Sequence, residues 1–129
     1  MENEKGIKKE GESENYLKTA KEYLNEKKFE EAIKFFEKSI EQTANPESLF
    51  QMAQMYEKGL GVEKNEKKAF ELFEKSSNFG NLKGKYILAE KYKSSSSFLK
   101  TDFKKSFQLF KECEENGDLD SIHQIGKKN

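Results

Sequence analysis

Apolar side chains return every three to four residues along most of the chain, as they do on one face of an α-helix. A first helix is predicted to begin at Ser13 or Glu14 and to end before the polar break 25–28. Further helices are predicted over about 29–40, 46–58, 66–78, 82–93 and 103–116, with one more over 119–126. Because the breaks between them are short, we expect consecutive helices to lie antiparallel. The pattern therefore predicts an all-α chain of about seven helices.

The two ends of the chain lack this pattern. Residues 1–13 are polar, charged and glycine-bearing, with Ile7 as the only apolar residue after the first methionine. Such a segment has too little apolar surface to offset the entropy of ordering it, so we predict a disordered charged tail. Residues 127–129 are predicted to be a second, short tail.

Capping residues mark several of the predicted helix ends. Asn45 precedes Pro46, which suits the first position of a helix because its missing N–H is not needed there. Asn65 and Asp102 are predicted to cap the helices that follow them. Gly80 is predicted to end its helix in the left-handed conformation.

The stretch 49–80 is repeated along the chain at a shift of 33 residues backward and 36 or 37 forward. A self-match of this period is typical of stacked helical hairpins. It divides the chain into units 14–45, 46–81 and 82–118, with a partial capping unit 119–126 that carries Leu119, Ile122 and Ile125. The repeated positions are small residues, which allow close helix crossing, and aromatic residues, which fill the space beside them. They are Ala20, Tyr23, Ala32, Phe36, Ala53, Tyr56, Gly59, Gly61, Ala69, Phe73, Gly80, Ala89, Tyr92, Phe110 and Gly117.

The turn Gly59-Leu60-Gly61-Val62 lengthens the second unit. Its two glycines indicate positive φ angles or a close backbone approach, and Leu60 or Val62 is expected to tuck under the hairpin. The third unit has the serine run 94–97 in this place, and Lys85 stands where the second unit has Leu49.

These features resemble a known family. The second unit resembles a Sel1-like repeat through Met52-Ala53, Met55-Tyr56, the glycine turn, Lys68-Ala69, Phe73 and Gly80. The first unit resembles the related tetratricopeptide repeat, and the third a degenerate Sel1-like repeat. The resemblance spans about residues 14–126. It implies a right-handed α-α superhelix, or solenoid, of antiparallel helix pairs, and a scaffolding function.

Composition narrows the function classes. The net charge is zero, all 24 basic residues are lysine, and the lysines are interleaved with glutamate, so no basic face for nucleic acid is expected. No run approaches the roughly 20 apolar residues of a membrane span, and the N-terminus has no apolar signal segment. We therefore expect a cytoplasmic protein, with the nucleus as an alternative. One cysteine, Cys113, cannot form an internal disulfide and is expected to be a small packing residue.

Candidate chemistry is sparse. His123 is the single histidine and would be a base or metal ligand only with a partner that the sequence does not supply, so a side chain at the rim is the preferred interpretation. Neighbouring glutamates on a helix point in different directions and make poor acid–base pairs. We expect no catalytic residues, no cofactor and no metal. The run Ser94–Ser97 is interpreted as a flexible loop, with phosphorylation near Lys91, Lys93 and Lys100 as an alternative.

The first helices of such units line the concave surface, where a partner is expected to bind. Leu17, Phe50 and Tyr86 share one repeat position there and either form an apolar stripe that grips a peptide or helix, or pack against the next unit. Tetratricopeptide repeats of the chaperone-binding type clamp a C-terminal carboxylate with lysine and asparagine. Leu17 stands where that clamp requires lysine, which argues against this binding mode. The predicted protein-binding residues are Leu17, Lys21, Asn25, Phe50, Gln54, Glu57, Tyr86, Glu90 and Lys93.

Three hypotheses for function follow. The first is a non-catalytic, monomeric adaptor or scaffold that binds a peptide or helix of another protein. The second is a short piece or paralogue of a longer Sel1-like regulatory protein. The third, least favoured, is a hydrolase resembling the cysteine-rich bacterial Sel1-like proteins, which carry paired cysteines in each repeat where this chain has only Cys113.

Overall fold

Six α-helices make up the part of the chain that the computed structural model describes, residues 2–117, with side chains described from residue 11. No strand occurs in this part, so the all-α prediction is confirmed. The predicted bounds of the third, fourth and sixth helices agree with the structure, and the fifth ends one residue early. The seventh predicted helix, 119–126, lies outside the described residues. The helices are α1 (Glu2–Asn25), α2 (Phe29–Gln42), α3 (Pro46–Lys58), α4 (Glu66–Asn78), α5 (Leu82–Tyr92) and α6 (Phe103–Asn116).

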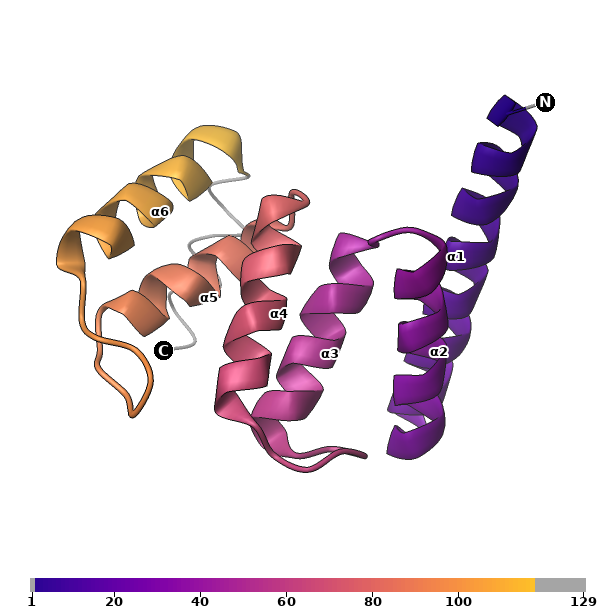
Figure 1. Cartoon of the computed structure of the whole chain (residues 1–129), viewed down its shortest axis with the longest axis horizontal. Helices are drawn as coiled ribbons and strands as arrows, with labels where there is room; N and C mark the ends of the chain where they lie inside the picture. The colour runs from indigo at the N-terminus through magenta and orange to yellow at the C-terminus, as the bar shows by residue number, and fades with distance from the viewer. Residues whose placement is uncertain (1, 118–129) are drawn as a thin grey trace.

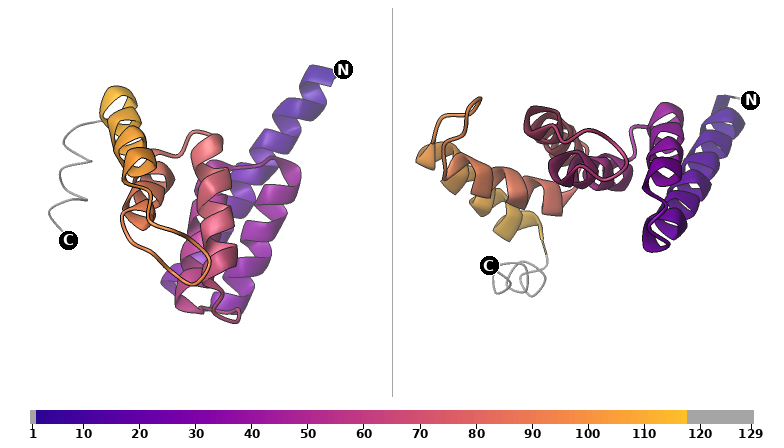
Figure 2. Two further views of the ribbon diagram at one scale, coloured as in Figure 1. Left: turned by 60° about the vertical axis from the view of Figure 1, so that its left-hand side comes forward. Right: turned by 90° about the horizontal axis from the view of Figure 1, so that it is seen from below.

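The helices form three antiparallel hairpins, α1–α2, α3–α4 and α5–α6, which follow one another in a row (Figure 1). Each helix packs chiefly against its hairpin partner, while α2 meets α3 and α4 meets α5 where one unit joins the next. Figure 2, seen from below, shows the three hairpins side by side along the long axis. This is the solenoid of helix pairs that the repeat period predicts.

Helix α1 begins at Glu2, so the prediction of a disordered tail over residues 1–13 is wrong for residues 2–13. The segment contains no proline and is rich in glutamate and lysine, which are good helix formers. Its last residue belongs to the core, because Ser13 is buried and its hydroxyl donates to the carbonyl oxygen of Ser39 at 2.9 Å. Before Ser13, α1 extends past the end of α2 (Figure 1).

Asparagine and aspartate side chains cap four of the six helices. In each case a side-chain oxygen accepts a hydrogen bond from the backbone N–H three residues later, at 2.8–3.0 Å. The predicted caps Asn45, Asn65 and Asp102 are confirmed, and Asn81 is a fourth that the sequence analysis missed.

Glycine follows the end of both α4 and α6, but in different conformations. Gly80 has φ +102° and its N–H donates to Ser77, while the N–H of Asn81 donates to Ser76, which is a Schellman motif. Helix α6 also ends before a glycine, Gly117, but that residue is extended, with φ −117°. Gly117 is therefore not a left-handed cap like Gly80.

The glycine turn of the second unit touches the first unit. Gly59 and Gly61 both have φ +72°, which L side chains rarely adopt. A Cβ atom at Gly61 would lie 2.6 Å from the backbone carbon of Phe29 and 2.9 Å from the nitrogen of Glu30, at the start of α2. Both predicted reasons for glycine, positive φ and close approach, therefore hold at Gly61, and the turn fixes how the first two hairpins stack.

The repeated small and aromatic positions form a continuous core. Their alanines are fully buried, as are two of the phenylalanines, Phe36 and Phe73, while the tyrosines and Phe110 are half-buried against this core. Phe35, which lies off the apolar stripe of α2, is also half-buried. It stacks on Tyr23 of its own hairpin at 5.5 Å between ring centroids, and so does not reach a neighbouring unit.

A second repeated contact joins the two helices of a hairpin. In the second unit the Ser76 hydroxyl donates to the carbonyl oxygen of Pro46 at 3.0 Å, and in the third unit the Cys113 thiol donates to that of Leu82 at 3.7 Å. Pro46 and Leu82 are both the first residue of their helix. Cys113 is fully buried, in agreement with its predicted role as a small packing residue.

Candidate functional site

The nine predicted binding residues divide by exposure. Lys21, Asn25 and Lys93 are exposed, while Gln54, Glu57, Tyr86 and Glu90 are half-buried. Leu17 and Phe50 are buried, with exposed fractions of 8% and 6%.

The predicted apolar stripe on the first helices is therefore not available to a partner. The ring of Phe50 lies edge-on to Phe73 at 5.7 Å, and the ring of Tyr86 lies edge-on to Phe110 at 5.2 Å. Each pair joins the two helices of one hairpin. The alternative is packing against the next unit, but the observed aromatic contact of Phe50 is with Phe73 of its own unit. The wrong prediction arose because a position beside the packing alanine was assumed to face outward.

The polar members of the set lie on a surface that joins the three first helices. Lys21 of α1 pairs with Glu47 of α3 at 3.6 Å, and Lys91 of α5 pairs with Glu57 of α3 at 2.6 Å. Surface ion pairs of this kind contribute only about 0–1 kcal/mol each to stability. Here they are informative because they show which helices approach one another. They link α3 to α1 on one side and to α5 on the other. We call this surface the first-helix face, and it is formed by the polar members Lys21, Asn25, Gln54, Glu57, Glu90 and Lys93.

A groove that the sequence analysis missed runs between α2 and α4, with α3 as its floor. Its volume is about 530 Å³. Floor residues Leu49, Met52 and Tyr56 follow helical spacing on α3, on a different side of that helix from Phe50. We call it the α2–α4 groove, and the residues that line it are Glu37, Ile40, Glu41, Ala44, Leu49, Met52, Tyr56, Lys68, Leu72, Lys75 and Phe79.

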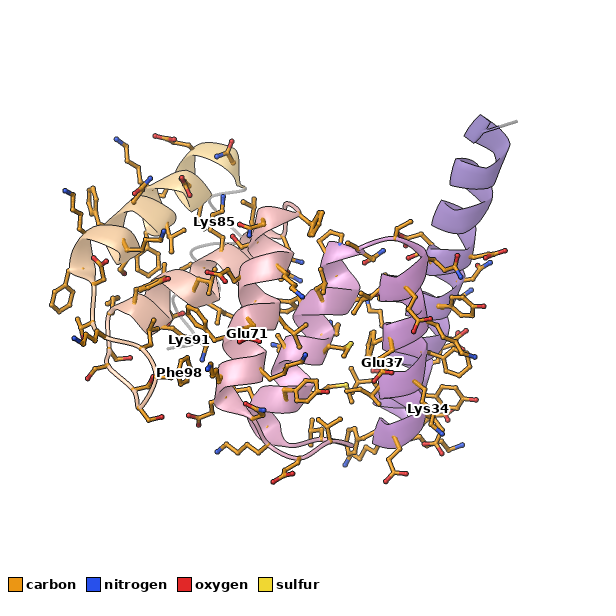
Figure 3. The ribbon with its side chains drawn as sticks, viewed as in Figure 1. Lys34, Glu37, Glu71, Lys85, Lys91 and Phe98 are labelled. Atoms are coloured by element: carbon orange, nitrogen blue, oxygen red, sulfur yellow. The ribbon has the colours of Figure 1, made fainter. Side chains whose placement is uncertain are left out.

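The two walls of the groove carry opposite charges. The α2 wall presents Glu37 and Glu41, and the α4 wall presents Lys68 and Lys75, all four exposed. Figure 3 shows Glu37 on the edge of α2 that faces α3. The sequence does indicate that Glu37 and Glu41 lie on one face of a helix, since they are one helical turn apart. The groove itself depends on the spacing between hairpins, and a repeat pattern does not reveal that spacing.

Two groups in the described part have shifted acidities. Burial raises the pKa of the Cys113 thiol above its ordinary value, with Lys85 opposing and Glu112 and Glu114 adding to the rise. Burial also raises the pKa of the Tyr92 hydroxyl, helped by neighbouring carboxylates. A raised thiol pKa leaves little of the reactive thiolate near neutral pH, so Cys113 has the character of a structural residue.

The described part of the chain offers neither a metal-binding cluster nor a membrane-spanning helix. Residues 11–117 hold no group of three or more His, Cys, Asp or Glu side chains that could bind a metal ion together. None of α1 to α6 is long and apolar enough to cross a membrane. His123 lies outside the described residues.

The serine loop 94–97 is exposed to solvent. Ser94 to Ser97 are all exposed, and the N–H of Ser96 donates to the carbonyl oxygen of Leu99. Lys91 lines a small cavity together with Ser94 and Ser96, but its ammonium group already pairs with Glu57. Phosphorylation of this loop stays a prediction.

Comparison with known proteins agrees with this architecture. The Sel1 repeat family matches residues 26–43 and 46–81. These two segments are thus similar to Sel1 repeats. The longer match has the bounds of the second unit, and the shorter one falls inside the first unit, which the sequence analysis likened to a tetratricopeptide repeat. Sel1 repeats generally serve in protein interactions and are typically non-catalytic.

Solved structures carry the same fold. A Sel1 repeat protein from Oxalobacter formigenes has a TM-score of 0.73 and 25% identity, over 86% of this chain and 44% of that protein. A protective antigen of uropathogenic Escherichia coli strains, which displays an SLR fold, has a TM-score of 0.74 and 24% identity, over 89% of this chain and 25% of that one. This chain thus spans less than half the length of either structure. No curated protein sequence matches it.

Proposed function

We propose that this Sel1 repeat protein is a non-catalytic adaptor or scaffold that binds a peptide or helix of another protein on its first-helix face. The observation that carries the proposal is the pair of cross-unit contacts, Lys21–Glu47 and Lys91–Glu57. They link the first helices of three consecutive hairpins, which supports a binding surface that continues over them. A surface that continues over several repeats is the means by which solenoids hold extended partners.

The chemistry of the described residues supports a binding role over a catalytic one. Cys113, the single cysteine, is fully buried, and its thiol pKa is raised. A nucleophile needs the opposite environment, with access to substrate and a lowered pKa.

The test is a triple variant of the first-helix face, Lys21→Ala, Gln54→Ala and Glu90→Ala. Its matched control, Lys34→Ala, Glu71→Ala and Gln108→Ala, removes the same three residue types from exposed positions on α2, α4 and α6. Figure 3 shows two of the control residues, Lys34 and Glu71. Each tagged protein is used to capture partners from its native cell, with quantitative mass spectrometry as the readout.

The first-helix variant is expected to lose the specific partner while the control retains it, and both are expected to keep wild-type helical circular dichroism. Alanine at a few contact residues commonly lowers affinity by tenfold or more because few residues carry most of the binding energy. Equal capture by the two folded variants would place the binding surface elsewhere.

A second candidate has its own observation. Phe70 of α4 is only 9% exposed, because it packs edge-on against Tyr92 and Phe98 of the next unit. Its repeat counterpart in α6, Phe107, is 71% exposed, and Phe103 one turn earlier is 68% exposed. We propose as the alternative that the chain acts within a longer Sel1-like regulatory protein, in which a further hairpin covers these rings.

A further inference from the structure

The charged walls of the α2–α4 groove do not pair with each other. Among residues 11–117, the ion pairs within 4 Å do not include Glu37, Glu41, Lys68 or Lys75. The groove is therefore wide enough to keep a row of carboxylates and a row of ammonium groups apart, with an apolar floor between them. These four charges are ready to meet charges on whatever enters the groove.

The same place in the next unit has different chemistry. Lys85 stands where the floor has Leu49, and Glu112 stands where the α4 wall has Lys75. These two residues pair with each other at 3.4 Å. The third unit thus joins its wall to its floor by an ion pair, whereas the second unit has the buried Leu49 in its floor and the exposed Lys75 in its wall. The chemistry of the α2–α4 junction is therefore not repeated in the next unit.

The dimensions and the charge spacing suit a helix. With a rise of about 1.5 Å per residue, the lining residues of α2, Glu37 to Glu41, span about 6 Å and those of α4, Lys68 to Lys75, span about 10 Å, which is about one to two helical turns. Glu37 and Glu41 are four residues apart, and Lys68 and Lys75 are seven apart, so each wall presents charges at one-turn or two-turn intervals. An amphipathic helix presents its own side chains at the same intervals.

We propose that the α2–α4 groove binds an amphipathic α-helix of a partner protein. The helix places an apolar stripe on Ile40, Ala44 and Tyr56, which are half-buried, and on the exposed Phe79. Its basic flank faces Glu37 and Glu41, and its acidic flank faces Lys68 and Lys75. This goes beyond the first-helix face, because it adds a second binding surface with its own partner chemistry.

The opposite walls also set the direction of the bound helix. Turning a helix end for end over the groove exchanges its two flanks, so a helix with one basic and one acidic flank fits in only one direction. Exchanging the charges of the two walls would reverse that direction without weakening binding. This consequence separates charge recognition from apolar adhesion, which has no preferred direction.

The probe is a designed helical peptide of 18 residues with leucines at i, i+3, i+4 and i+7, lysines along one flank and glutamates along the other. A control peptide has the same composition with lysine and glutamate mixed on both flanks. Fluorescence anisotropy measures the binding of each to the full chain. We expect the sided peptide to bind roughly tenfold more tightly than the mixed one, and the difference to shrink as salt is raised.

Variants of the walls complete the test. Glu37→Lys with Glu41→Lys is expected to weaken the sided peptide roughly tenfold. Adding Lys68→Glu and Lys75→Glu restores its affinity, and a spin label at the peptide N-terminus then broadens NMR signals from the opposite end of the groove. All four residues are exposed, so the fold is expected to tolerate these changes.

Equal affinities for the two peptides, or no rescue by the fourfold variant, would overturn the proposal. A groove that binds the apolar dye ANS but neither peptide would be a small-molecule site and would overturn it as well. The variant Lys21→Ala, Gln54→Ala, Glu90→Ala should bind the sided peptide normally. Failure at the groove is thereby distinguished from failure of the first-helix face.

Discussion

At the scale of single residues, the same hydrogen bond between the two helices of a hairpin is made by a hydroxyl in one unit and by a thiol in the next. Ser76 and Cys113 occupy the same repeat position and donate to the first carbonyl of their partner helix. The thiol makes the longer, weaker bond and adds a titrating group to a buried place. Its raised pKa therefore has a consequence for stability.

We predict that Cys113→Ser keeps the fold and removes part of the alkaline loss of stability. In the wild type, the unfolded thiol loses its proton above its ordinary pKa of 9.0 while the folded thiol, with its raised pKa, retains it. The folded state then binds more protons, so the free energy of unfolding is full below pH 9 and falls as pH rises toward the folded pKa, by at most about 1.4 kcal/mol per pH unit.

Urea unfolding of both proteins at pH 7.5 and pH 10 measures this effect. The drop in unfolding free energy between the two pH values should be smaller for the serine variant. The Tyr92 hydroxyl, whose raised pKa starts from an ordinary value of 10.0, titrates in both proteins and so cancels in the comparison. Equal drops would show that the thiol does not contribute.

At the scale of elements, the glycine turn between α3 and α4 has two roles, since it reverses the chain and meets the neighbouring hairpin. Gly80 is constrained only by its positive φ angle, because a Cβ atom there would have no neighbour within 4 Å. Gly61 has both, because its Cβ would overlap the backbone of Phe29. Comparing the two glycines separates the cost of positive φ from the cost of pushing two units apart.

We predict that Gly61→Ala lowers the free energy of unfolding by clearly more than Gly80→Ala does. The left-handed conformation costs an alanine about 1–2 kcal/mol at either site. At Gly61 the overlap with α2 adds to this cost, and backbone atoms cannot move aside as a flexible side chain can. Thermal and urea unfolding of the two variants make the comparison, and equal losses would mean that the turn moves freely away from α2.

Helix positions were predicted well because their determinants are local. Asn45, Asn65 and Asp102 cap helices through bonds that span three residues, and such signals are legible in a sequence. The start of α1 was missed because helix formation there has no apolar stripe to reveal it.

The binding surfaces were predicted less well because they depend on distances between helices. The burial of Leu17 and Phe50 depends on how a hairpin closes, and the α2–α4 groove depends on how two hairpins are spaced. Repeat spacing identifies equivalent positions but not the rotation of each helix about its axis. A modest rotation suffices to move a side chain from the surface into the core.

At the scale of the whole molecule, side chains at equivalent repeat positions contribute differently to the stability of the protein, because their neighbours differ. We predict that Phe70→Ala lowers the free energy of unfolding by about 3–5 kcal/mol, as is typical of a buried aromatic ring. Phe107→Ala, at the same repeat position, should change it by less than about 0.5 kcal/mol, because that ring is exposed. Chemical denaturation monitored by circular dichroism compares the two, and similar losses would mean that Phe107 is covered in solution.

The stacking of hairpins in chain order also bears on how the protein is made. Each helix finds its main partner in the helix that comes directly before or after it. Contacts between residues close in the sequence form quickly, since little loop entropy is lost in bringing them together. As the chain leaves the ribosome, α1 and α2 have their full hairpin once Gln42 has emerged, and each later hairpin adds to a template that is already folded. Synthesis and folding can therefore proceed in step, from the N-terminal unit onward.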